Sequence, residues 1–389
     1  MKKWAISVII LLLMALIVLF GAAWYFGQIT YNAGFNIHAK FAPGGRYDNV
    51  FTVSSFDKNK ITLAYSFAGF TPINLPGVYA LQGKHVTGIV SRIIAKTKGE
   101  TTRHFILTGG VVSQGQKVVL NRHLKTDQEY LALLGQRVGY KRVFYQNSLG
   151  KFPAILTNNV SPNWVICVHG LRGDEVRYGC MRDAQQFVDQ GQRIFSISYR
   201  NDKGSPQDKS QMYLYGATEW QDLNAAVLYA KAHGAKNIIL YGGSMGGAVV
   251  LSYMKHAKDS AFIKGIILNA PVVNFYQSVK IFGQGAYPFL PDWFLRFVKY
   301  TMSVYYHINW GDVNQEDAID HIHVPVLLIH GMQDKFSPVE QSDQLAKKNP
   351  KLISYYRSVG VHGAVYNVDI RKYNANLIEF IKKVYPPSS

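Results

Sequence analysis

The chain has 389 residues, of which 48% are hydrophobic and 17% are charged. It is long enough for two domains and apolar enough to bury a large core, which excludes an intrinsically disordered protein. Lys and Arg outnumber Asp and Glu by 42 to 24, and this leaves a formal net charge of +18.

An uncharged run occupies residues 4–26, directly after Lys2 and Lys3, and Ser7 is its one clearly polar member. As a helix it would span roughly 34 Å, enough to cross a hydrocarbon core of about 30 Å. We expect a single-pass anchor in the cell membrane, with the rest of the chain outside the cytoplasm because the two lysines keep the N-terminus inside. The alternative is a cleaved signal peptide, for which residues 21–23 offer small side chains.

A small β-rich domain is predicted at residues 46–130, after a polar linker at 27–45. Short β-branched and aromatic runs alternate there with turn-forming clusters. The runs are VFTVSSF, ITLAYSF, VTGIVSRII, HFILTGGVV and KVVLNRH. We find no chemistry-bearing motif in this domain.

Half of the basic surplus lies in residues 84–151, where twelve basic residues accompany three acidic ones. Such a region suits nucleic acid or an anionic membrane surface. No nucleic-acid motif accompanies it, so we expect no nucleic-acid partner and favour membrane lipid. A merely solvated basic face is the alternative.

Residues 131–389 alternate apolar strand-like runs with amphipathic helix-length stretches, which predicts a mostly parallel sheet covered by helices on both faces. The predicted strands are 142–146, 164–169, 193–199, 237–242, 264–270, 324–331 and 352–358. The predicted helices lie near 175–190, 216–233, 245–257, 338–348 and 371–385. The aromatic-rich interval 274–322 is too long for a simple connection and predicts a partly helical cap over the carboxyl edge of the sheet.

A nucleophile motif, Gly242-Gly243-Ser244-Met245-Gly246, stands between a predicted strand and a predicted helix. It fits G-x-S-x-G with Gly242 and Gly246 as the outer glycines. A nucleophilic serine on a sharp, strained turn needs neighbours without side chains, and the following helix points free N–H groups at the reacting centre. Ser244 is therefore the candidate nucleophile.

An oxyanion hole is predicted from two backbone amides. His169-Gly170-Leu171 ends the central strand at 164–169, so the Leu171 N–H should lie near the Met245 N–H that follows the serine. We expect the backbone of His169, rather than its ring, to matter. Tyr199, Arg200 and Arg172 are expected near the pocket.

The remaining members of a catalytic triad are Asp334 and His362. Asp334 lies in the loop after the strand at 324–331, and His362 lies between the last strand and the last helix. The chain order Ser244, Asp334, His362 is the order expected for a triad on this kind of sheet. His362 would take the serine proton, while Asp334 would fix the imidazole tautomer.

The sequence predicts neither a metal site nor a cofactor. His321 and His323 alternate like metal ligands, but no partner set with zinc spacing accompanies them. The two cysteines, Cys167 and Cys180, are interpreted as free thiols, with a bridge between them as the alternative.

From about residue 130 to 385 the chain resembles the α/β-hydrolase superfamily, in particular its bacterial membrane-associated serine hydrolases. The resemblance rests on VHGLRG (168–173), SYRNDKGSP (198–206), GATEWQDLNAAVLYA (216–230), YGGSMGG (241–247), LNAP (268–271), LLIHGMQD (327–334) and GVHGAVYNVD (360–369). It implies the same triad and the same two oxyanion donors. A valine before His362 departs from the family's usual small residue.

Together these features predict a serine hydrolase that cleaves a small-molecule carboxylic ester or thioester through an acyl-enzyme. The aromatic cap and the anchor favour an apolar acyl group. The same groups serve a peptidase or an acyltransferase, so both stay open. A non-catalytic membrane-bound binding protein on a retired hydrolase scaffold is the alternative from another class.

Overall fold

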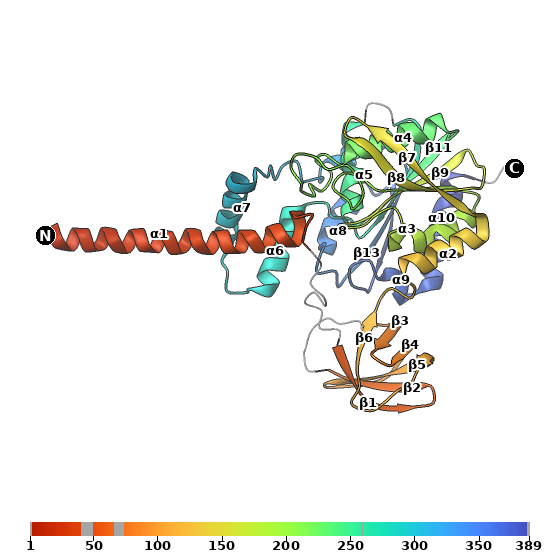
Figure 1. Cartoon of the computed structure of the whole chain (residues 1–389), viewed down its shortest axis with the longest axis horizontal. Coiled ribbons are helices and arrows are strands. Elements are labelled where there is room, and N and C mark those ends of the chain that lie inside the picture. Colours follow the sequence, from red (N-terminus) through yellow and green to blue (C-terminus); the bar gives the residue numbers. More distant parts are fainter. Residues whose placement is uncertain (1, 40–49, 66–73, 258–259, 387–389) are drawn as a thin grey trace.

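The computed structural model describes residues 2–39, 50–65, 74–257 and 260–386. Three parts are visible in Figure 1: a long N-terminal helix, a small β-barrel and an α/β domain. The order of the parts along the chain matches the order of the predicted elements, and the α/β-hydrolase fold, the β-rich domain and the N-terminal apolar helix are confirmed.

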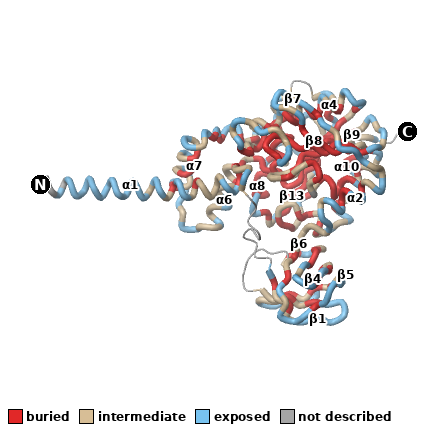
Figure 2. The backbone as a smooth tube through the Cα atoms, in the orientation of Figure 1, coloured by how far each residue is buried: buried red, intermediate tan, exposed pale blue. Residues whose placement is uncertain are grey.

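The N-terminal helix α1 (Lys2–Thr30) continues as a single π-helical turn (Tyr31–Phe35). Its first two thirds project from the body and are exposed to solvent in the absence of a membrane (Figures 1 and 2). Among the described residues, Ile6–Phe35 is the one segment long and apolar enough to cross a membrane. The predicted linker at 27–45 is wrong up to Phe35, because that part is helical and Phe35 is fully buried. Residues 40–45 of that linker lie outside the described residues.

The β-rich domain is a closed six-stranded antiparallel barrel with the strand order β1-β2-β5-β4-β3-β6. Its strands are β1 (Val50–Asp57), β2 (Lys60–Ala64), β3 (Tyr79–Gly83), β4 (Val86–Thr97), β5 (Glu100–Gly110) and β6 (Lys117–Asn121). Strand residues alternate between a buried apolar core and the surface, as the period of two requires. Closure leaves no free strand edge. The short strand β3 is not among the predicted runs.

The α/β domain begins with the helix α2 (Asp127–Val138), which Thr126 and Glu129 cap with reciprocal hydrogen bonds. The predicted boundary at 130/131 is therefore wrong, because it cuts through this helix. The helix packs against α3 (Tyr178–Asp189) of the α/β domain and belongs to the core of that domain.

The central sheet has eight strands in the order β14-β13-β12-β11-β9-β10-β8-β7. All seven predicted strands are present, and β8 is an additional one. The strands are β7 (Tyr140–Asn147), β8 (Gly150–Thr157), β9 (Asn163–Val168), β10 (Arg193–Ile197), β11 (Asn237–Gly243), β12 (Ile263–Asn269), β13 (Val326–Gly331) and β14 (Ile353–Ser358). From β10 to β14 neighbouring strands are parallel, whereas β8 pairs antiparallel with both β10 and β7.

Helices cover both faces of the sheet and bury two separate apolar cores. One core lies under α2, α3 and α10 (Ile370–Val384). The other lies under α4 (Trp220–Ala232), α5 (Met245–His256) and α8 (Val339–Lys348). The strands are therefore apolar on both sides, as the uninterrupted runs in the sequence predict.

Two helices occupy the predicted cap interval, α6 (Phe275–Ala286) and α7 (Asp292–Tyr306), followed by a short 3-10 turn (Ala318–His321). Figure 1 shows both helices beside the last turns of α1, at the end of the α/β domain that faces the N-terminal helix. The aromatic rings Phe26, Tyr31 and Phe35 pack among the rings of this cap, so the cap and the end of α1 share one core.

Cys167 in β9 and Cys180 in α3 form a disulfide, with their Cα atoms 5.8 Å apart. The interpretation of two free thiols is wrong. The side chain of Cys167 points to the sheet face that α3 covers, and Cys180 in the first turn of that helix comes directly over it. Spacing in the sequence does not reveal this bridge, because the two positions are 13 apart and belong to different elements, a strand and a helix.

Candidate active site

Ser244 stands on the sharp turn between β11 and α5. Its backbone adopts φ 54° and ψ −119°, a positive φ that is strained for a residue with a side chain. The flanking glycines are required by close packing: a Cβ at Gly242 would stand 2.6 Å from the carbonyl oxygen of Gly246, and one at Gly246 would collide with the carbonyls of Val168 and His169. The glycines predicted from the motif therefore make this turn possible.

The structure brings Ser244, His362 and Asp334 together in one hydrogen-bonded chain. The Oγ of Ser244 lies 2.9 Å from Nε2 of His362. The Nδ1 of the same ring lies 2.6 Å from Oδ2 of Asp334. The serine follows β11, the aspartate follows β13 and the histidine follows β14, so all three stand at the carboxyl ends of parallel strands.

Asp334 is fully enclosed by donors. Its Oδ1 accepts the backbone N–H groups of Phe336 and Ser337 at 2.8 and 2.9 Å, and its Oδ2 accepts from His362 and, at 3.1 Å, from Nε2 of His330. Burial alone would raise the pKa of Asp334, but the two imidazoles and their hydrogen bonds lower it well below its ordinary range. The carboxylate is therefore ionised at neutral pH.

His330 is a member of the site that the sequence reasoning missed. Its Nε2 lies 2.9 Å from the carbonyl of Ser337 as well as beside Asp334, and its Nδ1 lies 2.6 Å from the hydroxyl of Ser342. Two acceptors at Nε2 assign the proton to that nitrogen, which leaves Nδ1 to accept from the serine. The signal in the sequence was the spacing of His330 and Asp334, which are four residues apart in HGMQD. The loop between them turns back, so that the ring of His330 faces the carboxylate of Asp334.

The predicted oxyanion donors lie on the two segments that meet at the serine. A Cβ at Gly170 would stand 3.1 Å from the Cβ of Ser244, so the loop that carries Leu171 runs directly past the nucleophile. Met245 is the first residue of α5, where backbone N–H groups have no partner within the helix. Within the part of the chain that the structure describes, neither amide is paired with a protein acceptor.

The ring of His169 holds the loop that carries Leu171, which corrects the expectation that this ring has no role. Its Nδ1 lies 2.7 Å from the carbonyl oxygen of Gly170, and its Nε2 lies 2.8 Å from Asp202. Burial alone lowers the pKa of His169, but the charge and hydrogen bond of Asp202 raise it above its ordinary value. A carbonyl and the next N–H point in opposite directions in a trans peptide, so this bond directs the Leu171 N–H away from the His169 ring.

The other residues expected near the pocket serve the framework. Tyr199 is buried and stacks on the ring of His169, 4.3 Å away. Arg200 is buried and paired with Asp222 at 2.8 Å. Arg172 donates to carbonyl groups in the segment 32–36, so it ties the end of α1 to the loop after β9.

The barrel contacts the loop that carries His362. Arg122, just after β6, donates from its guanidinium to the carbonyl oxygen of His362. Asn367 donates to the carbonyls of Val78 and Arg122, each at 2.8 Å, and accepts from the Val78 N–H at 2.8 Å. Figure 1 shows the barrel next to α9 (Val365–Val368), the short helix of this loop. The β-barrel, in which the sequence shows no chemistry-bearing motif, therefore supports the loop that carries His362.

A second contact reinforces the first. Leu75 of the barrel packs with Val361 and Ala364 on either side of His362. Arg103, fully buried in the barrel, donates to the carbonyls of Leu75 and Gly77 at 2.9 and 2.8 Å and so fixes the segment that makes this contact. Part of the basic region at 84–151 is therefore used for internal structure.

An apolar rim borders His362. The ring of Phe336 lies 5.6 Å from the ring of His362, and Phe282 from α6 lies 6.0 Å from Phe336. Both phenylalanines are exposed, as is Met332 in the loop after β13. The cap thus reaches the entrance of the site with aromatic surface.

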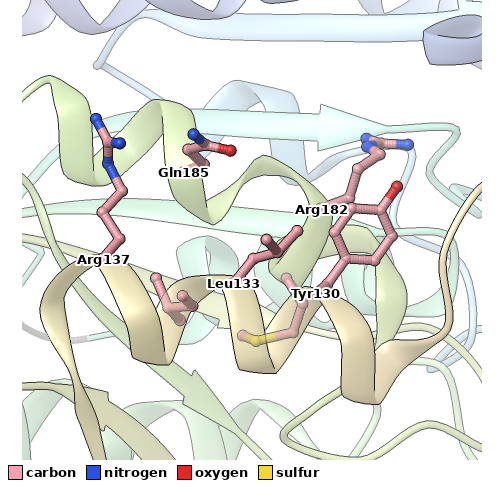
Figure 3. Close-up of a pocket in the computed structure, with 7 residues that line it drawn as sticks. Tyr130, Leu133, Arg137, Arg182 and Gln185 are labelled. Carbon is pink, nitrogen blue, oxygen red and sulfur yellow. The ribbon is translucent and has the colours of Figure 1, made fainter.

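A separate, narrow cavity of about 20 Å³ lies between α2 and α3 (Figure 3). It has room for about one water molecule. Ser244, Asp334 and His362 are not among its lining residues, so it is separate from the candidate site. Its lining residues are Tyr130, Leu133, Leu134, Arg137, Met181, Arg182 and Gln185.

Comparisons with known proteins agree with this fold. The family model described as "Serine aminopeptidase, S33" (Hydrolase_4) matches residues 161–311. The uncharacterized protein YqkD of Bacillus subtilis is 26% identical over 227 residues, which cover 57% of this chain and 72% of that protein. The esterase Pf2001 of Pyrococcus furiosus superposes with a TM-score of 0.51 at 22% identity, over 67% of this chain and 95% of that chain. An esterase of Exiguobacterium antarcticum matches at 18% identity and a TM-score of 0.46, over 62% of this chain and all of that one.

The sheet order, the turn at Ser244 and the superposition on the Pyrococcus furiosus esterase define the fold of this chain. It is the α/β-hydrolase fold.

Proposed function

We propose that the protein is a serine hydrolase that cleaves a carboxylic ester or thioester through an acyl-enzyme. The observation that carries the proposal is the chain of contacts from Ser244 through His362 to Asp334, at 2.9 and 2.6 Å. A nucleophile, a base within reach and a buried anion behind the base are the parts that acyl transfer from a serine needs. The proposed chemistry needs no metal or cofactor.

In this mechanism Nε2 of His362 takes the proton as Ser244 Oγ attacks the substrate carbonyl carbon. The carbonyl oxygen becomes negatively charged and is stabilised by the N–H groups of Leu171 and Met245. The tetrahedral intermediate collapses, the bond to the leaving alcohol or thiol breaks, and His362 returns the proton to it. Water then attacks the acyl-enzyme with the same base, which releases the acid and restores the serine. Asp334 stabilises the imidazolium during both steps.

An apolar acyl group is the substrate we favour. Phe336 lies beside His362, Phe282 lies beside Phe336, and both rings are exposed. Burial of a hydrocarbon chain against such rings is favourable by roughly 25 cal/mol for each Å² of apolar surface removed from water.

Peptide hydrolysis is the second candidate, since the matching family model is described as a serine aminopeptidase. An aminopeptidase must bind a free α-ammonium group, for which a carboxylate at the pocket is the natural partner. Asp334 does not serve this purpose because four donors already surround it. We therefore place the ester first. An acyltransferase would use the same residues with another acceptor in place of water.

We further propose that α1 anchors the protein in the cell membrane, with the catalytic domain on the extracytoplasmic side. The exposed apolar length of α1 and the two lysines at its start support this arrangement. The disulfide Cys167–Cys180 supports it independently, because disulfides persist in oxidising compartments. Contact of the basic region 84–151 with lipid headgroups belongs to the same proposal.

The experiment is a substrate panel on the purified full-length protein. We expect turnover of p-nitrophenyl esters, rising with acyl length, and none of aminoacyl p-nitroanilides. Ser244→Ala should abolish turnover, whereas Ser113→Ala, at an exposed serine of the barrel, should leave it unchanged. Cleavage of the anilides by the wild type, together with its loss in Ser244→Ala, would favour the peptidase. Absence of turnover on every substrate would favour the non-catalytic binding protein.

A further inference from the structure

The cap helix α7 has two apolar faces, and protein covers one of them. The covered face consists of residues at spacings of four, buried in the core shared with the α/β domain: Phe294, Val298 and Met302. The second face repeats at spacings of four, three and four, which places its members on one side of a helix. We call it the α7 stripe: Trp293, Phe297, Tyr300 and Val304.

Three of the four residues of the α7 stripe are exposed although they are apolar, and the fourth, Phe297, is half-buried. Relative exposure is 56% for Trp293, 64% for Tyr300 and 60% for Val304. Three large exposed apolar side chains on one helix face differ from the scattered apolar side chains of an ordinary surface. Exposed aromatic residues continue beyond the helix with Phe289, in the turn before α7.

The α7 stripe adjoins α1 along the last turns of that helix. Phe297 of the stripe packs edge-on against Phe20, with ring centroids 5.0 Å apart. Tyr306 at the end of α7 stacks on Tyr31 at 4.1 Å. A groove of about 470 Å³ runs between the two helices (Figure 1 shows their arrangement). Its lining is almost entirely apolar: Phe20, Trp24, Gly27, Tyr300, Thr301, Met302, Val304, Tyr305 and Tyr306.

The position of these contacts along α1 sets their depth in a bilayer. A hydrocarbon core of about 30 Å takes roughly 20 helical residues, and counting from Trp4 that length ends near Ala23. The contacts with α7 extend from Phe20 to Tyr31 and therefore straddle the level at which α1 leaves the hydrocarbon. Tryptophan and tyrosine rings favour this interfacial zone.

We propose that the α7 stripe and the groove beside it dock into the outer face of the lipid bilayer, so that the cap is an interfacial membrane element. The inference rests on the proposed membrane span of α1. Whatever covers the groove must contact Phe20 and Trp24 as well as α7, and those residues belong to the helix that lies in lipid. Lipid acyl chains therefore cover both helices as one continuous surface.

The charge distribution on α7 agrees with this placement. Asp292, Arg296 and Lys299 lie on a third side of the helix, away from the stripe. Lys299 is held over the ring of Tyr276, 4.2 Å from its centroid, and Asp292 is paired with Lys280. An apolar strip flanked by paired or basic groups is typical of a helix that lies at a membrane surface.

The two cap helices face different surroundings in this arrangement. The helix α6 carries Phe282 next to Phe336 at the rim of the candidate site, while α7 carries the stripe that docks into the bilayer.

The test is quenching of tryptophan emission in nanodiscs of phosphatidylcholine brominated near the headgroup end of its acyl chains. The full-length protein is compared with Trp293→Phe, Trp24→Phe and Trp220→Phe, and the quenched emission is the difference from unbrominated discs. Trp24 reports the span. Trp220, at the start of α4 and stacked on His256, is the matched control.

We expect the quenched emission to fall in Trp293→Phe and in Trp24→Phe and to stay unchanged in Trp220→Phe. A fall in Trp24→Phe alone would overturn the docking of the stripe and leave the anchor intact. No fall in either variant would overturn the span and the docking together. Mass photometry gives the number of protein copies in each disc. Two copies in each disc, together with unquenched emission from Trp293, would mean that a second copy of the chain covers the stripe, and would overturn lipid as its partner.

Discussion

Replacement of Asp334 by asparagine tests how the buried carboxylate controls the base. The substitution keeps the volume of the side chain and removes its charge. The backbone N–H groups of Phe336 and Ser337 hold Oδ1 at 2.8 and 2.9 Å, so the amide oxygen of the introduced side chain must take that place. Its NH₂ group then faces Nδ1 of His362, where Oδ2 of the native carboxylate accepts at 2.6 Å.

The consequence is a reversed tautomer at the base. A donor facing Nδ1 makes that nitrogen an acceptor, so the proton of the neutral ring moves to Nε2, which can no longer receive the proton of Ser244. The corresponding change in trypsin lowers kcat about 10⁴-fold, and a tenfold change equals about 1.4 kcal/mol of activation free energy. We expect a loss of about 10³- to 10⁴-fold in kcat.

The assay is steady-state hydrolysis of a p-nitrophenyl ester at pH 7, with circular dichroism to establish folding. Asp317→Asn is the matched control, because Asp317 is a largely exposed carboxylate that pairs with Lys255 on the surface. It should retain full activity. A folded Asp334→Asn enzyme within tenfold of the wild-type kcat would refute the tautomer reasoning.

Three further predictions concern groups outside the triad. Arg122→Ala removes a charged hydrogen bond to the His362 carbonyl, typically worth about 1.5–3 kcal/mol. Because about 1.4 kcal/mol equals a tenfold change in rate, kcat should fall about 10- to 100-fold with KM unchanged, and Arg122→Lys should restore part of the lost kcat. An unchanged kcat, with or without a rise in KM, would contradict this. Burial raises the pKa of Glu219 from 4.5 to about 7, so the contribution of this group to the free energy of unfolding is full below pH 4.5 and is lost as pH rises through 7. Glu219→Gln should remove up to about 3 kcal/mol of that pH dependence, measured by denaturant titrations between pH 4.5 and 7. A pH dependence equal to that of the wild type would refute the assignment to Glu219. Reduction of the Cys167–Cys180 disulfide should lower the free energy of unfolding by roughly 3 kcal/mol. The variant with alanine at both positions should not respond to the reductant. An equal response of the wild type and the variant would contradict the bridge.

The arrangement of the α/β domain could be predicted because its signals are local. Each buried parallel strand appears as an apolar run, and strand ends place Ser244, Asp334 and His362 at one edge of the sheet before any coordinates are known. The strand β8 was not predicted because Pro153 interrupts its pattern. A proline lacks the N–H that a strand interior normally donates, and its presence argues against a strand.

The contacts that support the site could not be predicted, because they join distant parts of the chain. Arg122 meets the carbonyl of His362 across 240 residues, and nothing in the local pattern of either segment indicates the other. The bridge between Cys167 and Cys180 depends on how α3 crosses β9. The predicted length of the helix does not determine that crossing. The aromatic residues of the α7 stripe are visible in the sequence. Which of them stay exposed depends on how α1 packs against α7, and the local pattern does not predict that packing.

Activation of the Ser244 hydroxyl by His362 is the central claim, and covalent labelling tests it most directly. The full-length protein is treated with a fluorophosphonate, digested and analysed by mass spectrometry, alongside Ser244→Ala and His362→Ala. We predict one phosphonylated peptide, with the adduct on Ser244, absent from the first variant and formed far more slowly in the second. An adduct on another residue, or labelling that persists without Ser244, would contradict the account.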